Sequence, residues 1–300
     1  MTAPSTFLKG RRLSSVFDSR HGTIIFGAIS ASLCTALTLT IAANMLAFGK
    51  TVEDDAQIAK SLATMLRAGR TVISRNQDRI NDPNTGNKGL DGKMVLTEAT
   101  AIYRQATEND PATIDPKSLH GQLIRMQMDS IAEVMEVHQE TLNRRGIGFK
   151  GFIPAVFGRL VNEAFGRRAA GIAEMKVTAP PQLIRNPKVQ PDEWELDVIQ
   201  TRLMSSSWPK DQSYTAMAAK SGVQALRTPI PEYYGPSCLT CHGSPQGEID
   251  ITGFPKETSP ASRKRAPAKA TSAASSASRC TDEPGAALVD RVFLALRYDL

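Results

Sequence analysis

The stretch Ser237-Cys238-Leu239-Thr240-Cys241-His242-Gly243 contains the pattern Cys-x-x-Cys-His. This pattern is typical of the sites at which a c-type haem is attached to a protein. Each thiol would form a thioether with a haem vinyl group, and His242 would supply its imidazole to the iron as the proximal ligand. The sequence therefore predicts one covalent haem c, and the rest of the chain must build a pocket around it.

Two other chemistries use a Cys-x-x-Cys pair. A structural zinc site needs two further ligands at suitable spacing, and the sequence has no second Cys-x-x-Cys pair. A redox-active pair lies at the start of a helix in a thioredoxin-like βαβ pattern, which is absent here. The other two of the four cysteines, Cys34 and Cys280, lack motif spacing, so a disulfide framework is not expected either.

Residues 23–48 form an uncharged, mostly apolar run. About 20 such residues are enough to span a bilayer. Basic residues dominate 1–22 and acidic residues follow at 53–55, so the positive-inside rule places 1–22 in the cytoplasm and the main domain outside. We therefore expect a single-pass protein of the bacterial inner membrane with a periplasmic domain, the compartment in which haem c is attached. A cleaved signal peptide is the alternative.

The formal net charge of +6 arises largely in two flanking regions. A nucleic-acid-binding surface would instead gather basic residues among aromatic ones on a folded face. No such cluster appears in the sequence, so a nucleic-acid partner is not expected.

The order of helical and strand patterns predicts an α+β domain. Apolar residues recur at helical spacing in several stretches, and a helix is expected to begin at an N-cap Asp192. Short strands come later, and two of them form a hairpin closed by Lys220-Ser221-Gly222. The predicted helices cover 52–80, 96–106, 119–143 and 153–168, and the predicted strands cover 175–178, 214–219 and 224–229.

Several short segments, in this order, resemble a bacterial family of membrane-anchored, single-haem c proteins with a PAS-like periplasmic domain. The resemblance covers 50–257 and implies a four- or five-stranded antiparallel sheet flanked by helices, with the haem on one side. Members often carry a signalling output domain, and we expect this chain to have none of its own. The segments are Asn76-Gln77-x-x-Ile80-Asn81, Gly148-Phe149-Lys150-Gly151-Phe152-Ile153-Pro154-Ala155, Lys176-Val177-Thr178, Arg185-Asn186-Pro187, Pro191-Asp192-x-Trp194-Glu195, Pro231-Glu232-Tyr233-Tyr234 and Asp250-Ile251-Thr252-Gly253-x-Pro255-Lys256-Glu257.

The pattern of this family stops after Glu257, where members continue into a final strand. Residues 258–300 contain a basic run and an Ala/Ser-rich segment, a composition typical of disorder. Leu288 to Tyr298 is a short apolar stretch without family resemblance. We therefore expect a disordered tail in which a frameshift or truncation has removed the final strand of the sheet.

The sequence does not decide the sixth iron ligand, and an open position or a water is one alternative. His138 lies on an apolar helix stripe and Met65 on the first periplasmic helix, and each is a candidate distal ligand or an ordinary core residue. Arg227, Tyr233 and Tyr234 precede the motif closely enough to be candidates for contacts with the haem propionates, or for surface packing. His120 is expected to be solvated.

The expected function is sensing of redox state or of a small gas, because a change of iron ligation would shift the helices nearest the membrane. By analogy with similar sensors, the chain is expected to form a homodimer through these helices. A single-haem electron-transfer cytochrome is the alternative. An enzyme such as a peroxidase is not expected, because no distal His/Arg pair is evident.

Overall fold

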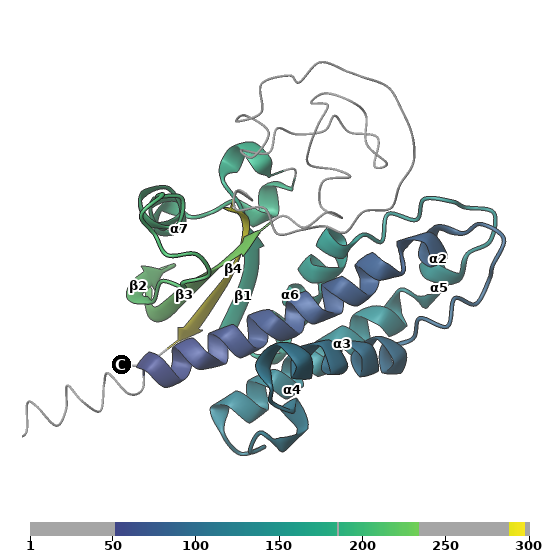
Figure 1. Cartoon of the computed structure of the whole chain (residues 1–300), viewed down its shortest axis with the longest axis horizontal. Helices are drawn as coiled ribbons and strands as arrows, with labels where there is room; N and C mark the ends of the chain where they lie inside the picture. The colour runs from purple at the N-terminus through teal and green to yellow at the C-terminus, as the bar shows by residue number, and fades with distance from the viewer. Residues whose placement is uncertain (1–51, 185, 234–287, 298–300) are drawn as a thin grey trace, which may run out of the picture. The chain divides into compact units, whose positions relative to one another are not determined.

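The computed structural model describes residues 52–184, 186–233 and 288–297 (Figure 1). The predicted cytoplasmic segment 1–22, the predicted membrane span 23–48, the haem motif and residues 258–287 lie outside these ranges. Among the described residues, no helix is long and apolar enough to cross a membrane.

The predicted helices form, with two interruptions. The helix expected over 52–80 is a long helix of residues 52–75 followed by a short one after Asn76, and the helix expected over 119–143 breaks at His138. The further elements are α2 (Gln77–Asn81), α3 (Gly92–Thr107), α4 (Leu119–Val137), α5 (Gln139–Asn143), α6 (Pro154–Arg168) and α7 (Glu193–Val198), which continues into a π-helical turn over Ile199–Leu203.

Side chains at the helix starts explain where several of these helices begin. The carboxylate of Asp91 accepts a hydrogen bond from the Met94 N–H, and the hydroxyl of Ser118 accepts one from the Gly121 N–H. At α7, Asp192 and Glu195 form a reciprocal capping box, which confirms the predicted N-cap. Such caps satisfy backbone N–H groups that have no partner within the helix.

The strands form one four-stranded antiparallel sheet in the order β1-β4-β3-β2. Its members are β1 (Ala173–Thr178), β2 (Ala216–Lys220), β3 (Val223–Tyr233) and β4 (Leu288–Arg297). Between β2 and β3, Ser221 and Gly222 both have positive φ, 52° and 80°. Positive φ at both central residues is typical of the two-residue hairpin turn that matches strand twist, so the predicted hairpin is confirmed.

Strand β4 corrects the expectation for the C-terminal region. The apolar stretch that begins at Leu288 is part of the sheet, where it pairs with β1 on one side and β3 on the other. The register places Leu294 between Met175 and Thr228, and Val292 between Val177 and Ile230. The prediction of a tail without a final strand is therefore wrong for residues 288–297, because a central strand needs only a short apolar segment that can pair on both edges.

The hydrophobic core lies between the helices and one face of the sheet. The predicted stripe of the long helix is completely or almost completely buried: Ile58, Leu62, Met65, Val72 and Ile73. Gly69 lets the long helix approach α6, because a Cβ at this position would lie 3.1 Å from the Phe157 ring. Met175 of β1 and Ile230 of β3 belong to the same core.

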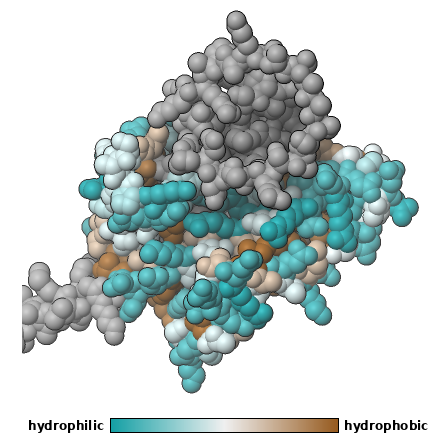
Figure 2. Space-filling model, viewed as in Figure 1, coloured by the Kyte–Doolittle hydropathy of each residue, from teal (hydrophilic) through white to brown (hydrophobic). Residues whose placement is uncertain are grey.

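Helix α7 lies across the strands from α6 and the long helix (Figure 1). The sheet thus has the large helical core on one side and the short α7 segment on the other. On the face shown in Figure 2, the described surface is mostly hydrophilic with scattered hydrophobic residues. The apolar side chains are therefore concentrated in the interior. Polar contacts gather around the end of β3.

Candidate functional site

The end of β3 is the described part of the chain that comes nearest to the haem motif in sequence. Tyr233 ends the strand, and Cys238 follows five residues later. A fully extended chain advances at most about 3.6 Å per residue, so Cys238 lies within about 18 Å of Tyr233. Cys238, Cys241, His242 and Tyr234 themselves lie outside the described residues, and their predicted roles stay predictions.

An ion pair joins the end of β3 to the long helix. The guanidinium of Arg70 lies 2.6 Å from the carboxylate of Glu232, and both side chains are largely buried. Arg70 also packs against Gly158 of α6, where a Cβ would lie 3.0 Å from the Arg70 Cδ. The residue that precedes Tyr233 is thus held directly by the helix that leads back toward the predicted membrane span.

Tyr233 is anchored to the loop before β2. Its hydroxyl oxygen accepts a hydrogen bond of 3.1 Å from the backbone N–H of Asp211, and the Lys210 ammonium lies 5.5 Å from its ring centroid. Asp211 has a left-handed backbone conformation, with φ of 63°. The hydroxyl proton of Tyr233 is not used in this bond, so the predicted propionate contact of Tyr233 stays a prediction.

A small cleft of about 210 Å³ lies between the long helix and the end of β3. It contains two cationic side chains from the same helix, Lys60 and Arg67, and one carboxylate, Asp211. The Nε of Arg67 is buried and has no hydrogen-bond partner among the described residues. The sequence analysis did not single out these cations, although their spacing of seven residues along one helix places them on the same face. The cleft is lined by Lys60, Thr64, Arg67, Asp211, Ile230 and Pro231.

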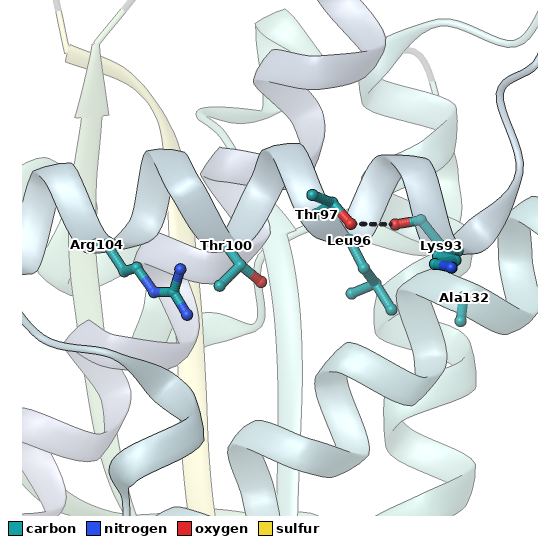
Figure 3. Close-up of a pocket in the computed structure, with 6 residues that line it drawn as sticks. All are labelled: Lys93, Leu96, Thr97, Thr100, Arg104 and Ala132. Atoms are coloured by element: carbon teal, nitrogen blue, oxygen red, sulfur yellow. Dashed lines mark hydrogen bonds between the residues drawn. The ribbon is translucent and has the colours of Figure 1, made fainter.

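A larger groove of about 510 Å³ lies between α3 and α4 (Figure 3). The guanidinium of Arg104 at one end binds the carboxylate of Asp110 at 2.5 Å, and the hydroxyl of Thr97 donates to the Lys93 carbonyl. All its lining residues belong to α3 and α4, so the groove is not formed by β3, from which the haem motif continues. The residues are Lys93, Leu96, Thr97, Thr100, Arg104 and Ala132.

Arg227, a candidate for propionate binding, is buried against α7. Its guanidinium lies 2.6 Å from Asp192 and 3.0 Å from Glu195, and it stacks 4.3 Å from the Trp194 ring centroid. Lys176 of β1 completes the network at 2.5 Å from Glu195. Arg227 is only 2% exposed, so its described contacts give it a structural role at the α7 interface.

The electrostatics of this network follow from its geometry. Burial alone would raise the pKa of Asp192, but the hydrogen bond from Arg227 and the Glu195 backbone N–H outweigh it. The positive charges of Arg227 and Lys176 act in the same direction, and the pKa of Asp192 lies below its usual value. The network therefore keeps Asp192 ionised while it caps α7.

The two candidate distal ligands occupy different environments. Met65 is completely buried in the hydrophobic core, as core packing requires. His138 is partly buried at the junction of α4 and α5, where its Nδ1 donates to the Val134 carbonyl at 2.8 Å and its ring lies 5.3 Å from that of Phe152. This bond leaves Nε2 with its lone pair, which is the form of histidine that binds a metal. Both assignments stay predictions.

His120 is packed between helices, whereas the sequence predicts that it is solvated. It is half-buried, and its Nε2 lies 2.7 Å from the hydroxyl of Ser61, which in turn lies 2.7 Å from the Tyr103 hydroxyl. Burial lowers the pKa of His120. The predicted solvated histidine is therefore part of a polar chain that joins the long helix, α3 and α4.

Comparison with known proteins identifies the family. Residues 50–261 match the family described as Tll0287-like, whereas no curated protein and no solved structure matches. The match covers more than half of the 300 residues and includes the Cys-x-x-Cys-His motif. Among the described residues, no cluster of His, Cys, Asp and Glu side chains forms a metal site. The chain belongs to the Tll0287-like family, a cytochrome c-like sensor family of cyanobacteria, which is consistent with haem as its cofactor.

Proposed function

We propose that this chain is a membrane-anchored, periplasmic haem c protein that senses redox state or a small gas. The observation that carries the proposal is the motif Cys238-Leu239-Thr240-Cys241-His242 within the range matched by the family. Cys238 and Cys241 would hold one haem through thioethers, and His242 would bind its iron. A bound haem would supply a redox-active iron whose ligation changes with oxidation state or with a gas.

The cleft at the end of β3 supports the fit of a haem. A haem carries two propionate carboxylates, and buried carboxylates need cationic or hydrogen-bonding partners. The cleft contains the cations Lys60 and Arg67, and Arg67 has a buried Nε without a partner among the described residues. These are donors of the kind that an anionic group requires, and they lie on the long helix, across the cleft from the strand that leads to the motif.

The contacts of the long helix support a sensory role. Its Arg70 binds Glu232 directly before the end of β3, and its apolar stripe is buried in the core. A shift at the haem-bearing end of β3 would therefore act on this helix, which runs from the side of the predicted inner-membrane span 23–48. In this proposal the domain is PAS-like, pairs with a second copy through its membrane-proximal helices and signals through a partner rather than by catalysis.

Electron transfer is the second candidate, because the family is cytochrome c-like. An electron carrier keeps a six-coordinate iron in both oxidation states, whereas a gas sensor has a position that opens. The ferrous protein is therefore exposed to carbon monoxide and followed by absorption spectroscopy. A shift of the haem bands supports sensing, and unchanged bands support electron transfer.

Covalent haem attachment is tested in cells that can assemble c-type cytochromes. The full chain should give a c-type pyridine haemochrome spectrum and retain its haem in a denaturing gel. The double variant Cys238→Ala/Cys241→Ala should lose this haem, while Cys280→Ala, which removes a cysteine outside the motif, should keep it. A wild-type chain without covalent haem would overturn the proposal.

A further inference from the structure

We propose that Lys60 and Arg67 of the long helix form a carboxylate-binding site and that its occupant is the propionate group of the haem. The inference rests on the proposed haem function and names the residues through which the cofactor acts on the helix. It adds two residues to the sequence-based candidates for contacts with the propionates, which are Arg227, Tyr233 and Tyr234.

The two cations of the cleft, Lys60 and Arg67, have no ion-pair partner among the described residues, although Asp211 lines the same cleft. The hydroxyl of Thr64 donates its proton to the Lys60 carbonyl at 2.8 Å, so this proton is not available to an incoming anionic group. A buried guanidinium N–H without a partner costs free energy, which an anionic acceptor in the cleft would recover.

The described charges around the cleft are predominantly positive. Lys60 and Arg67 are positive, Lys210 lies beside Tyr233 at the neighbouring loop, and Asp211 is the one carboxylate in the lining. The adjacent Arg70–Glu232 pair is neutral as a unit. Three cations against one free carboxylate leave a positive excess, which matches the two negative charges of a haem.

The cleft lies beside the strand from which the chain continues to the haem motif. Ile230 and Pro231 form the apolar wall of the cleft, and β3 continues from them through Tyr233 toward Cys238. A haem tethered at Cys238 and Cys241 is confined near this end of the strand. A free carboxylate from solution would have to compete with a covalently tethered one, whose effective concentration is far higher.

This site would make the long helix sensitive to the oxidation state of the haem. A cation near the haem disfavours the ferric form, which carries one more positive charge than the ferrous form, and so raises the reduction potential. It also lowers the pKa of the propionate that it binds. Oxidation would in turn weaken the interaction of the haem with the helix.

The test uses the haem-loaded full chain and measures its midpoint potential as a function of pH by spectroelectrochemistry. Arg67→Met should lower the potential and move its pH-dependent step to higher pH. Lys60→Met should shift both in the same direction by less, because Lys60 is exposed. Lys93→Met, which removes the same charge from α3, should leave both values close to wild type.

Arg67→Lys keeps the positive charge while it changes the shape of the side chain, so it separates the effect of charge from that of packing. Circular dichroism and urea unfolding check that each variant is folded. Arg67→Lys should retain most of the wild-type potential. The inference is overturned if Arg67→Met behaves like Lys93→Met, or if Arg67→Lys shifts the potential as far as Arg67→Met. A wild-type chain without haem would instead contradict the proposed function, so the two failures are distinguishable.

Discussion

Between the long helix and α6, most of the buried side chains are apolar, whereas the interface between α7 and β3 contains a buried network of charged side chains. Leu62 and Phe157 represent the first region and are completely buried. Arg227 and Glu195 represent the second, at 2% and 1% exposure. Apolar burial is non-directional and tolerates small rearrangements, but a buried ion pair is favourable only while both partners are present. The two faces of the same sheet should therefore respond differently to mutation.

The largest effect is expected at the charged interface. Arg227→Ala removes the ion-pair partner of Asp192 and leaves buried Glu195 with Lys176 as its one described cation. Breaking a buried pair in this way costs about 3–5 kcal/mol. Urea unfolding measures the loss. Arg144→Ala, which breaks the exposed helical pair with Glu140, is the control and should cost about 0.3–0.5 kcal/mol. Similar losses for the two variants would show that the α7 network contributes no more than a surface pair.

The apolar core should show a comparable but more variable loss. Leu62→Ala removes a completely buried side chain from the long helix and should lower the free energy of unfolding by about 2–5 kcal/mol, depending on how far the cavity collapses. Leu119→Ala at an exposed position of α4 should change it by less than about 0.5 kcal/mol. If Leu62→Ala is as mild as Leu119→Ala, the long helix is not part of the folded core.

The smallest effect is expected at the polar chain inside the helical region. Because burial lowers the pKa of His120, the unfolded chain binds a proton more readily than the folded one below the usual histidine pKa of about 6.5. Stability should therefore fall as the pH drops from that value toward the lowered pKa. His120→Gln should flatten this pH dependence of the urea midpoint. An unchanged slope would show that His120 titrates alike in both states.

The elements that depend on short-range patterns could be predicted from the sequence. The apolar stripe of the long helix, the Asp192 cap and the β2–β3 hairpin all depend on residues close together in sequence, and all are present. The breaks at Asn76 and His138 were not predicted, because the apolar spacing continues across both. His120 was missed for a different reason, since its partner Ser61 is far away in the sequence.

The sheet and the candidate site show where sequence patterns are insufficient. Nothing within Leu288–Arg297 indicates that it pairs between β1 and β3, which lie far earlier in the chain. Arg227 is a candidate for the haem propionates because it precedes the motif, and its described ion-pair partners come from the start of α7. Arg67 was not considered, because an unpartnered Nε is a property of the packed structure.

The sequence by itself determined the spacing of Cys238, Cys241 and His242, which predicts haem attachment, and the apolar periodicity of the helices. Both depend only on residue types that lie close together in the chain. The tertiary structure decided the central position of β4, the enclosure of Arg227 by two carboxylates and the placement of Lys60 and Arg67 beside the end of β3. These features arise from contacts between segments that are distant in the chain, whose energies depend on burial and on which charges meet.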